Sequence, residues 1–218
     1  QGRGVLRDAI YGAIDGTVTT FAIVAGVAGA GLSPFVVVVL GLANVLADGF
    51  SMAAANYSGI KAEHDNFKRI RKIEERHIRE YPEGEWQEVR EILKRKGLEG
   101  EVLDQATDAI TQDRENWIAM MMDGEYGLGG IDPRPLRAAL ATFLAFLAAG
   151  MIPVLPFLFG IENAFIVSAW MTMAVFFGIG ALKSRWSLIP WWRSAAETML
   201  IGGAAAGLAY GVGNLFHI

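Results

Sequence analysis

The sequence predicts an all-α membrane protein in which five transmembrane helices carry a three-helix module inserted between the second and third helices. Three observations lead to this fold class: several long apolar segments, one strongly charged segment between them, and an uneven distribution of Lys and Arg. Hydrophobic residues make up 53% of the 218 residues. The apolar segments are too long for barrel strands, which cross a membrane in about 10 residues of alternating character.

The first two apolar segments, residues 9–30 and 34–57, each contain polar side chains. Asp15 lies in the first segment, and Asn44, Asp48 and Met52 lie in the second. An ionisable side chain in hydrocarbon costs on the order of 3 kcal/mol, and such residues usually line a cavity or an ion pathway. Asp15 is therefore a candidate functional residue. The alternative, a soluble protein with Asp15 on a helix surface, is disfavoured by the other apolar segments.

The last three apolar segments contain no charged residue. They cover residues 138–161, 163–182 and 198–216, and each reaches or approaches the roughly 20 residues that cross about 30 Å of hydrocarbon. Pro153 and Pro156 are expected to kink or end the first of them. In the last segment, Gly203, Gly207 and Gly211 predict a ridge of small residues for close helix packing.

The charged segment, residues 61–132, holds 12 of the 19 Lys and Arg residues and 18 of the 23 Asp and Glu residues. We therefore divide the chain into residues 1–60, 61–132 and 133–218. The second span enters the module without a flexible linker, so we expect one continuous helix. Helices are expected over 61–80, 85–96 and 98–126, the last with a break around Thr111 and Gln112. Such a module has a small core and should depend on a partner or on bound ions.

The basic residues predict the orientation. With a cytoplasmic amino terminus, five spans place all 19 Lys and Arg residues on the cytoplasmic side, as the positive-inside rule requires. We expect no signal peptide. The absence of cysteine excludes disulfides and thiolate metal sites. Neither an organic cofactor nor a nucleic-acid partner is expected.

Three groups of possible metal ligands occur in the module. Glu74 and His77 share one helical face at i, i+3, and Glu85 and Glu88 repeat this spacing. The third group is Met121, Met122 and Glu125. Carboxylates with one imidazole suit Fe²⁺, Mn²⁺ or Zn²⁺, and a thioether is a soft ligand that Ca²⁺ and Mg²⁺ do not select. Each motif alone has another interpretation, since acidic pairs also form solvated surfaces and a methionine pair also packs in a core.

Several of these motifs together resemble the vacuolar iron transporter family. They are Asp15-Gly16 before a Thr-rich apolar run, Ser51-Met52-Ala53-Ala54 before Tyr57-Ser58, and Met121-Met122-Asp123-Gly124-Glu125. The resemblance covers nearly the whole chain. It implies a homodimer that exports Fe²⁺, and often Mn²⁺, from the cytosol in exchange for protons. A membrane carboxylate that binds either a metal or a proton meets the minimum requirement for such antiport.

The resemblance also assigns roles to individual residues. It implies membrane ligands at Asp15 and Met52 and a proton or ion relay at Asp8. The implied cytosolic metal cluster comprises Glu74, His77, Glu85, Glu88, Met121, Met122 and Glu125. Three positions depart from the family pattern: Asn44 and His77 replace expected glutamates, and Asp48 replaces an expected small residue. Asn44 cannot take up a proton, whereas Asp48 can substitute for the missing carboxylate.

A different class of function is a membrane-anchored di-iron oxidase or a metal sensor that uses the module. It would explain Glu74 and His77 but not the intramembrane Asp15, Asp48 and Met52. A di-iron helical bundle also needs a second Glu-x-x-His motif, which this chain lacks. We therefore favour a transporter over an enzyme. The short chain favours a prokaryotic member of the family, in the plasma (inner) membrane.

Overall fold

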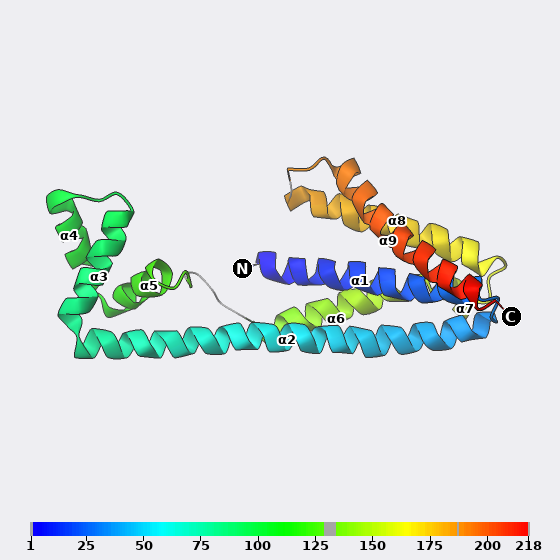
Figure 1. Ribbon diagram of the computed structural model, residues 1–218, viewed down its shortest axis with the longest axis horizontal. Helices are drawn as coiled ribbons and strands as arrows, with labels where there is room; N and C mark the ends of the chain where they lie inside the picture. Colours follow the sequence, from blue (N-terminus) through cyan, green and yellow to red (C-terminus); the bar gives the residue numbers. More distant parts are fainter. Residues whose placement is uncertain (1, 129–133, 187, 218) are drawn as a thin grey trace. The chain divides into compact units, whose positions relative to one another are not determined.

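The structure, a computed structural model, describes residues 2–128, 134–186 and 188–217, in which the regular elements are all helices (Figure 1). The chain separates into two compact units. We call Gln1–Ser58 with Pro135–Ile218 the membrane unit, and Gly59–Arg134 the module. The boundary that the sequence suggested between residues 132 and 133 lies outside the described residues.

The membrane unit contains the apolar helices. They are α1 (Gly2–Gly29), the first part of α2 (Pro34–Glu80), α6 (Pro135–Met151), α7 (Leu155–Leu158), α8 (Ala164–Lys183) and α9 (Trp191–Leu215). Four of them, α1, α2, α8 and α9, are long and apolar enough to cross a membrane, and α6 is a shorter apolar helix of 17 residues. The chain is therefore a multi-pass, all-helical membrane protein.

The third apolar segment is broken by its prolines. Helix α6 ends at Met151, before Pro153, and the four-residue α7 begins beside Pro156. Proline has no backbone N–H and cannot continue a regular helix. The carbonyl of Pro153 instead accepts a hydrogen bond of 2.7 Å from the buried Ser168 hydroxyl. The expected kink or end at these prolines is confirmed.

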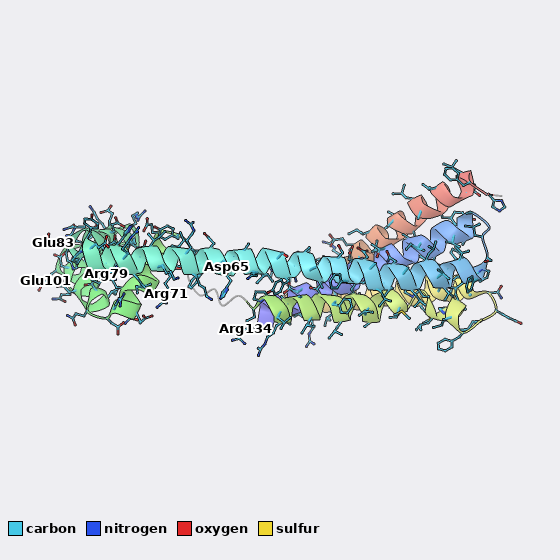
Figure 2. All side chains as sticks on the ribbon, turned by 90° about the horizontal axis from the view of Figure 1, so that it is seen from below. Asp65, Arg71, Arg79, Glu83, Glu101 and Arg134 are labelled. Atoms are coloured by element: carbon cyan, nitrogen blue, oxygen red, sulfur yellow. The ribbon has the colours of Figure 1, made fainter. Side chains whose placement is uncertain are left out.

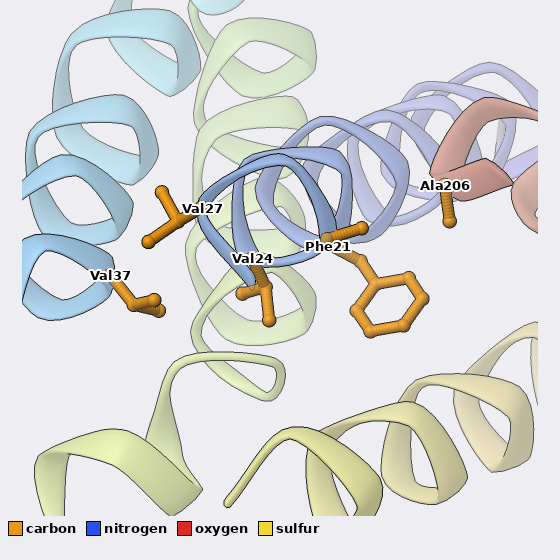
Figure 3. Packing of buried hydrophobic residues seen from close by; sticks show 6 residues of the cluster. Phe21, Val24, Val27, Val37 and Ala206 are labelled. Atoms are coloured by element: carbon orange, nitrogen blue, oxygen red, sulfur yellow. The ribbon is translucent and has the colours of Figure 1, made fainter. Parts of the chain in front are cut away.

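Apolar side chains from three helices form a core in the membrane unit. Phe21, Val24 and Val27 of α1 pack with Val37 of α2 and Ala206 of α9, and all are less than 10% exposed (Figure 3). These α1 positions recur every three residues, so they lie on one side of the helix. The core thereby holds α1 between its neighbours in the half of the helix that follows Thr20.

Glycines bring α1 and α6 together in the other half of α1. A Cβ atom at Gly12 would collide with the Thr142 carbonyl oxygen, and one at Gly16 would lie 2.6 Å from the Phe146 carbonyl oxygen. Backbone atoms cannot move aside as a flexible side chain can. These two glycines are therefore required for the close approach of α1 to α6.

We expect Gly16→Ala to destabilise the membrane unit by roughly 1–3 kcal/mol, since the added methyl group overpacks the α1–α6 contact. Gly203→Ala is the matched control, because a Cβ atom there would meet no other part of the described chain within 4 Å. Thermal unfolding of the purified protein in detergent measures both. Equal melting temperatures for the two variants would contradict this account of the contact.

The expected ridge of small residues in the last span is wrong within the described chain. Cβ atoms built at Gly203, Gly207 and Gly211 meet nothing within 4 Å. The contacts instead involve Gly202, which lies against Phe176 of α8, and Gly213, which lies against Gly26 of α1. The packed face of α9 is thus offset from the predicted one. Four-residue spacing alone does not identify which of several small-residue faces meets a neighbour.

The module comprises the end of α2 together with α3 (Pro82–Arg95), α4 (Gly100–Thr111) and α5 (Arg114–Gly124). Figure 2 shows charged side chains gathered over it, including the labelled Arg71 and Glu101. The expected end before Pro82 and the continuous α2 are both observed. The expected break around Thr111 and Gln112 is also observed: α4 ends at Thr111, and Asp113 caps α5 by accepting a hydrogen bond from the Asn116 N–H.

Candidate functional site

Polar residues form a stripe on each of the first two helices of the membrane unit. On α1, Asp8 and Asp15 are seven residues apart, and on α2, Asn44, Asp48 and Met52 follow one another every four residues. Both spacings keep the side chains on one helical face. Asp8 is only 5% exposed, and the other four residues are half-buried.

Hydrogen bonds join the two helices at one end of these stripes. The Asn44 amide donates to the hydroxyls of Thr19 and Thr20, each at 3.3 Å. The Thr19 hydroxyl in turn donates to the Asp15 carbonyl oxygen at 2.9 Å. Asn44 therefore contacts the helical turn that follows Asp15 and has a structural partner there.

A second polar contact lies at the other end of the stripes. The Asn56 amide donates to the Thr142 hydroxyl of α6 at 2.9 Å. That hydroxyl lies 3.4 Å from the Asp8 carbonyl oxygen and 3.0 Å from the Ala138 carbonyl oxygen. The sequence analysis missed Asn56 and Thr142. Asn56 could have been found, because it extends the four-residue spacing of the α2 stripe.

The Asn44 contact fixes which residues of the two stripes lie at the same level. Helices α1 and α2 are antiparallel neighbours, so a step toward the amino terminus of α1 corresponds to a step toward the carboxyl terminus of α2. Asp15 precedes Thr19 by four residues and Asp48 follows Asn44 by four, so Asp15 and Asp48 lie at the same height along the two helix axes. Met52 lies one further turn along α2, about 6 Å away along the axis. The sequence suggested that Met52 faces Asp15, whereas this register places Met52 between the levels of Asp15 and Asp8.

The module contains a compact group of possible metal ligands. One ligand atom from each of Glu74, His77 and Glu85 lies within 4.8 Å of the others. The His77 Nδ1 atom is 3.4 Å from Glu85 Oε1 and 3.9 Å from Glu74 Oε1. The end of α2 supplies the first two residues and the beginning of α3 supplies the third. Pro82 ends one helix and opens the next, which brings the two faces together.

Two buried oxygen atoms in this group need a partner. Glu74 is 1% exposed and Glu85 is 5% exposed. Their Oε2 atoms are buried and have no hydrogen-bond partner among the described residues. Buried unpaired carboxylate oxygens are costly, and natural proteins usually pair them or use them to bind a metal. The group therefore fits a divalent cation.

The remaining predicted ligands are less closely placed. Glu88 and Glu125 are exposed, and both act on Glu85 as neighbouring negative charges. Met121 packs with Val89 and other apolar side chains, and Met122 packs with Ile118 in a second cluster. Core packing, the alternative interpretation of the methionine pair, is thus observed. Coordination by the thioethers stays a prediction.

The structure adds Tyr126 to the site. Its hydroxyl donates a hydrogen bond of 3.1 Å to Glu74 Oε1. Burial, together with the nearby charges of Glu74 and Glu125, raises the pKa of Tyr126, so the phenol remains a donor at neutral pH. No sequence pattern indicates this contact, because it depends on how the end of α5 meets α2.

The acidic environment also changes Glu85. Burial is the largest cause and the negative charge of Glu74 the next, and together with other neighbours they raise the pKa of Glu85 to about 7. A carboxylate with this pKa is partly protonated near neutral pH. A metal ion at this position must therefore displace a proton.

We expect metal affinity to fall as the pH decreases from 8 to 6, because protonated Glu85 cannot coordinate. Stability of the metal-free protein should change in the opposite direction. The folded-state pKa lies above the unfolded value of 4.5. Protonated Glu85 therefore makes its full contribution to the free energy of unfolding below pH 4.5. This contribution, on the order of 2 kcal/mol, is lost as the pH rises through about 7.

Melting temperatures of the metal-free protein between pH 4.5 and 8, with Co²⁺ titrations at pH 6 and 8, measure both effects. Glu83→Gln serves as the control, because Glu83 is exposed on the same helix. The interpretation fails if Glu85→Gln shows the same pH dependence as the unmodified protein.

Comparison with known proteins places the chain among membrane transport proteins. Residues 6–214 match the VIT family. The chain is 34% identical to "Vacuolar iron transporter 1" of Oryza sativa subsp. japonica, over 95% of this chain and 84% of that protein. It is also 34% identical to "Vacuolar iron transporter 1" of Arabidopsis thaliana, over 94% and 84% of the two chains. It is 32% identical to "Vacuolar iron transporter" of Toxoplasma gondii, over 98% and 74%.

Proposed function

This chain belongs to the VIT family, and from that membership we propose that it is an iron transporter that moves Fe²⁺ out of the cytosol in exchange for protons. The observation that carries the proposal is the pair of polar stripes on α1 and α2. Asp8, Asp15, Asn44, Asp48 and Met52 line the proposed path in an otherwise apolar unit. Polar contacts join α1 to α2 at one end of these stripes and α2 to α6 at the other end.

Two carboxylates at one level provide the chemistry for exchange. In an apolar surrounding, Asp15 and Asp48 cannot both remain charged without a cation. A divalent ion neutralises both, and protons do the same when the ion leaves. The thioether of Met52, one turn nearer to Asp8, adds a soft ligand that favours Fe²⁺ over Mg²⁺. The path therefore holds either a metal or protons.

The module receives the ion in this proposal. Glu74, His77 and Glu85 provide two carboxylates and an imidazole, a donor set that suits Fe²⁺ or Mn²⁺. The unpaired oxygens of both glutamates support coordination at this position. Glu88, Glu125, Met121 and Met122 complete the proposed ligand set. We further propose that the protein acts as a homodimer in a lipid bilayer. The amino terminus and the module would then lie in the cytoplasm.

Proteins of this family are transporters and not enzymes, which argues against the di-iron oxidase. A sensor that only binds metal would have no use for the stripes in the membrane unit. The chain also contains a single Glu-x-x-His motif, that of Glu74 and His77.

Transport by purified protein in liposomes tests the proposal. With a proton gradient across the vesicle membrane, we expect anaerobic Fe²⁺ to move in one direction while a pH-sensitive dye reports protons moving in the other. Mn²⁺ tests the second substrate, and protein-free liposomes are the control. Metal movement without a matching proton signal would contradict exchange, and no movement of either metal would contradict transport.

A further inference from the structure

Tyr126 forms a hydrogen bond with the Glu74 carboxylate, one of the possible metal ligands of the module. The Tyr126 hydroxyl occupies Oε1 through a hydrogen bond of 3.1 Å. The Oε2 atom of the same group is buried and has no partner among the described residues. A carboxylate can bind an ion through one oxygen or through both. Here the phenol donates to Oε1, which reduces the capacity of this oxygen to act as a second ligand, while Oε2 accepts no hydrogen bond from a described donor.

The backbone on both sides of Tyr126 is fixed. Before it, Gly124 lies so close to α3 that a Cβ atom there would be 2.7 Å from a methyl carbon of Ile92. After it, Gly127 has a φ of +65° and donates a backbone hydrogen bond to the Asp123 carbonyl oxygen at 3.1 Å. Glycine adopts this left-handed conformation without strain, and such a residue commonly closes a helix.

Leu128 holds the same turn from the other side. Its N–H donates to the Met122 carbonyl oxygen at 2.8 Å, and its side chain packs against the cluster of Ile70, Ile78, Ile118 and Met122. Ile70 and Ile78 belong to α2, the helix that carries Glu74. The phenol is thus held against Glu74 by the fold of the module before any ion binds.

Divalent ions differ in their need for two-oxygen coordination. Ca²⁺ takes six to eight oxygen ligands and commonly uses carboxylates through both oxygens. Transition-metal ions accept fewer ligands and combine single carboxylate oxygens with imidazole. A glutamate that offers only Oε2 is therefore a poorer ligand for Ca²⁺ than for Fe²⁺ or Co²⁺.

We propose that Tyr126 is a specificity-determining residue of the module, which restricts Glu74 to coordination through Oε2 and so selects transition-metal ions against Ca²⁺. This inference rests on the proposed function, since it assumes that Glu74, His77 and Glu85 bind the transported ion. Tyr126 acts through Glu74 and is a positioning residue. Hydrogen bonds of this kind to metal ligands typically contribute 10–100-fold to affinity.

The full chain in detergent, with Tyr126→Phe, tests the proposal. Calorimetric titrations at pH 7.5 measure the dissociation constants for Co²⁺, an air-stable substitute for Fe²⁺, and for Ca²⁺. We expect Tyr126→Phe to weaken Co²⁺ binding about 10-fold. Ca²⁺ binding should stay the same or become tighter. The ratio of Co²⁺ affinity to Ca²⁺ affinity should therefore fall by about 10-fold or more. Tyr81→Phe is the matched control, because Tyr81 is 68% exposed in the same module.

The ratio separates positioning from general damage, because a loosened fold weakens both ions equally. Melting temperatures of the metal-free variants confirm that each is folded. An unchanged ratio, or an equal loss for both ions, would overturn the role of Tyr126 and leave the proposed function intact. Glu74→Gln tests the assignment of the metal centre itself. If this variant binds Co²⁺ as tightly as the unmodified chain, Glu74 is not a metal ligand, and both the proposed centre and the role of Tyr126 are wrong.

Discussion

Asp15→Asn should reduce metal-dependent proton movement in liposomes by at least about 100-fold, close to the background of empty vesicles. Asparagine has nearly the same size and stays polar, so the α1–α2 contact made by Asn44 through Thr19 and Thr20 should persist. What the substitution removes is the negative charge. Asparagine binds no proton in the physiological range and contributes no charge to hold a divalent ion.

The same reasoning separates Asp15 from its neighbours. Asp48→Asn should impair exchange as well, since the register places Asp48 at the level of Asp15. Glu162→Gln, at an exposed position after α7, removes a carboxylate outside the stripes and should leave transport unchanged. If Asp15→Asn retains more than a tenth of the normal proton signal, Asp15 is not the group that exchanges metal for protons.

The second large effect concerns the module, where Glu74→Gln combined with Glu85→Gln should change binding and stability in opposite directions. We expect Co²⁺ affinity to fall more than about 100-fold, because two of the three clustered ligands lose their charge. The metal-free protein should become more stable at pH 8 by roughly 1–3 kcal/mol. Removing buried, unpaired charges is often stabilising, and both carboxylates are at least 95% buried.

Titration with Co²⁺ and thermal unfolding without metal measure the two effects on the same preparation. Glu83→Gln, an exposed substitution on α3, should alter neither quantity. A double variant that loses both metal affinity and stability would show that these glutamates support the fold instead of a metal site. If the double variant keeps its Co²⁺ affinity, the metal is bound by other residues, with Glu88 and Glu125 as the next candidates.

The sequence alone predicted those features that depend on local chemistry. Pro153 and Pro156 break the third apolar segment because they cannot continue a helix wherever they occur. The faces that carry Asn44, Asp48 and Met52, or Glu74 and His77, follow from helical periodicity. The break around Thr111 and Gln112 was predicted, although the capping role of Asp113 that causes it was not.

Features that depend on tertiary contacts could not be predicted in this way. The bond from Tyr126 to Glu74 joins residues 52 positions apart, and the bond from Asn56 to Thr142 joins residues 86 positions apart. No short-range sequence pattern predicts either hydrogen bond. The same holds for α9, where the choice between Gly202 and Gly203 as the packed residue depends on its neighbours. The level of Met52 relative to Asp15 required a contact that fixes the register.

The glycine contacts between α1 and α6 also determine how rigidly these helices are held. Because the backbones meet at Gly12 and Gly16 without intervening side chains, sliding one helix along the other would drive carbonyl groups into each other. Helix α2 is attached to this pair differently, through side chains such as Phe146 beside Gly49 and through the amides of Asn44 and Asn56. Side chains can rotate and amides can exchange partners. The α1–α6 pair is therefore the more rigid contact of the membrane unit, whereas the contacts of α2 can rearrange through rotation of side chains.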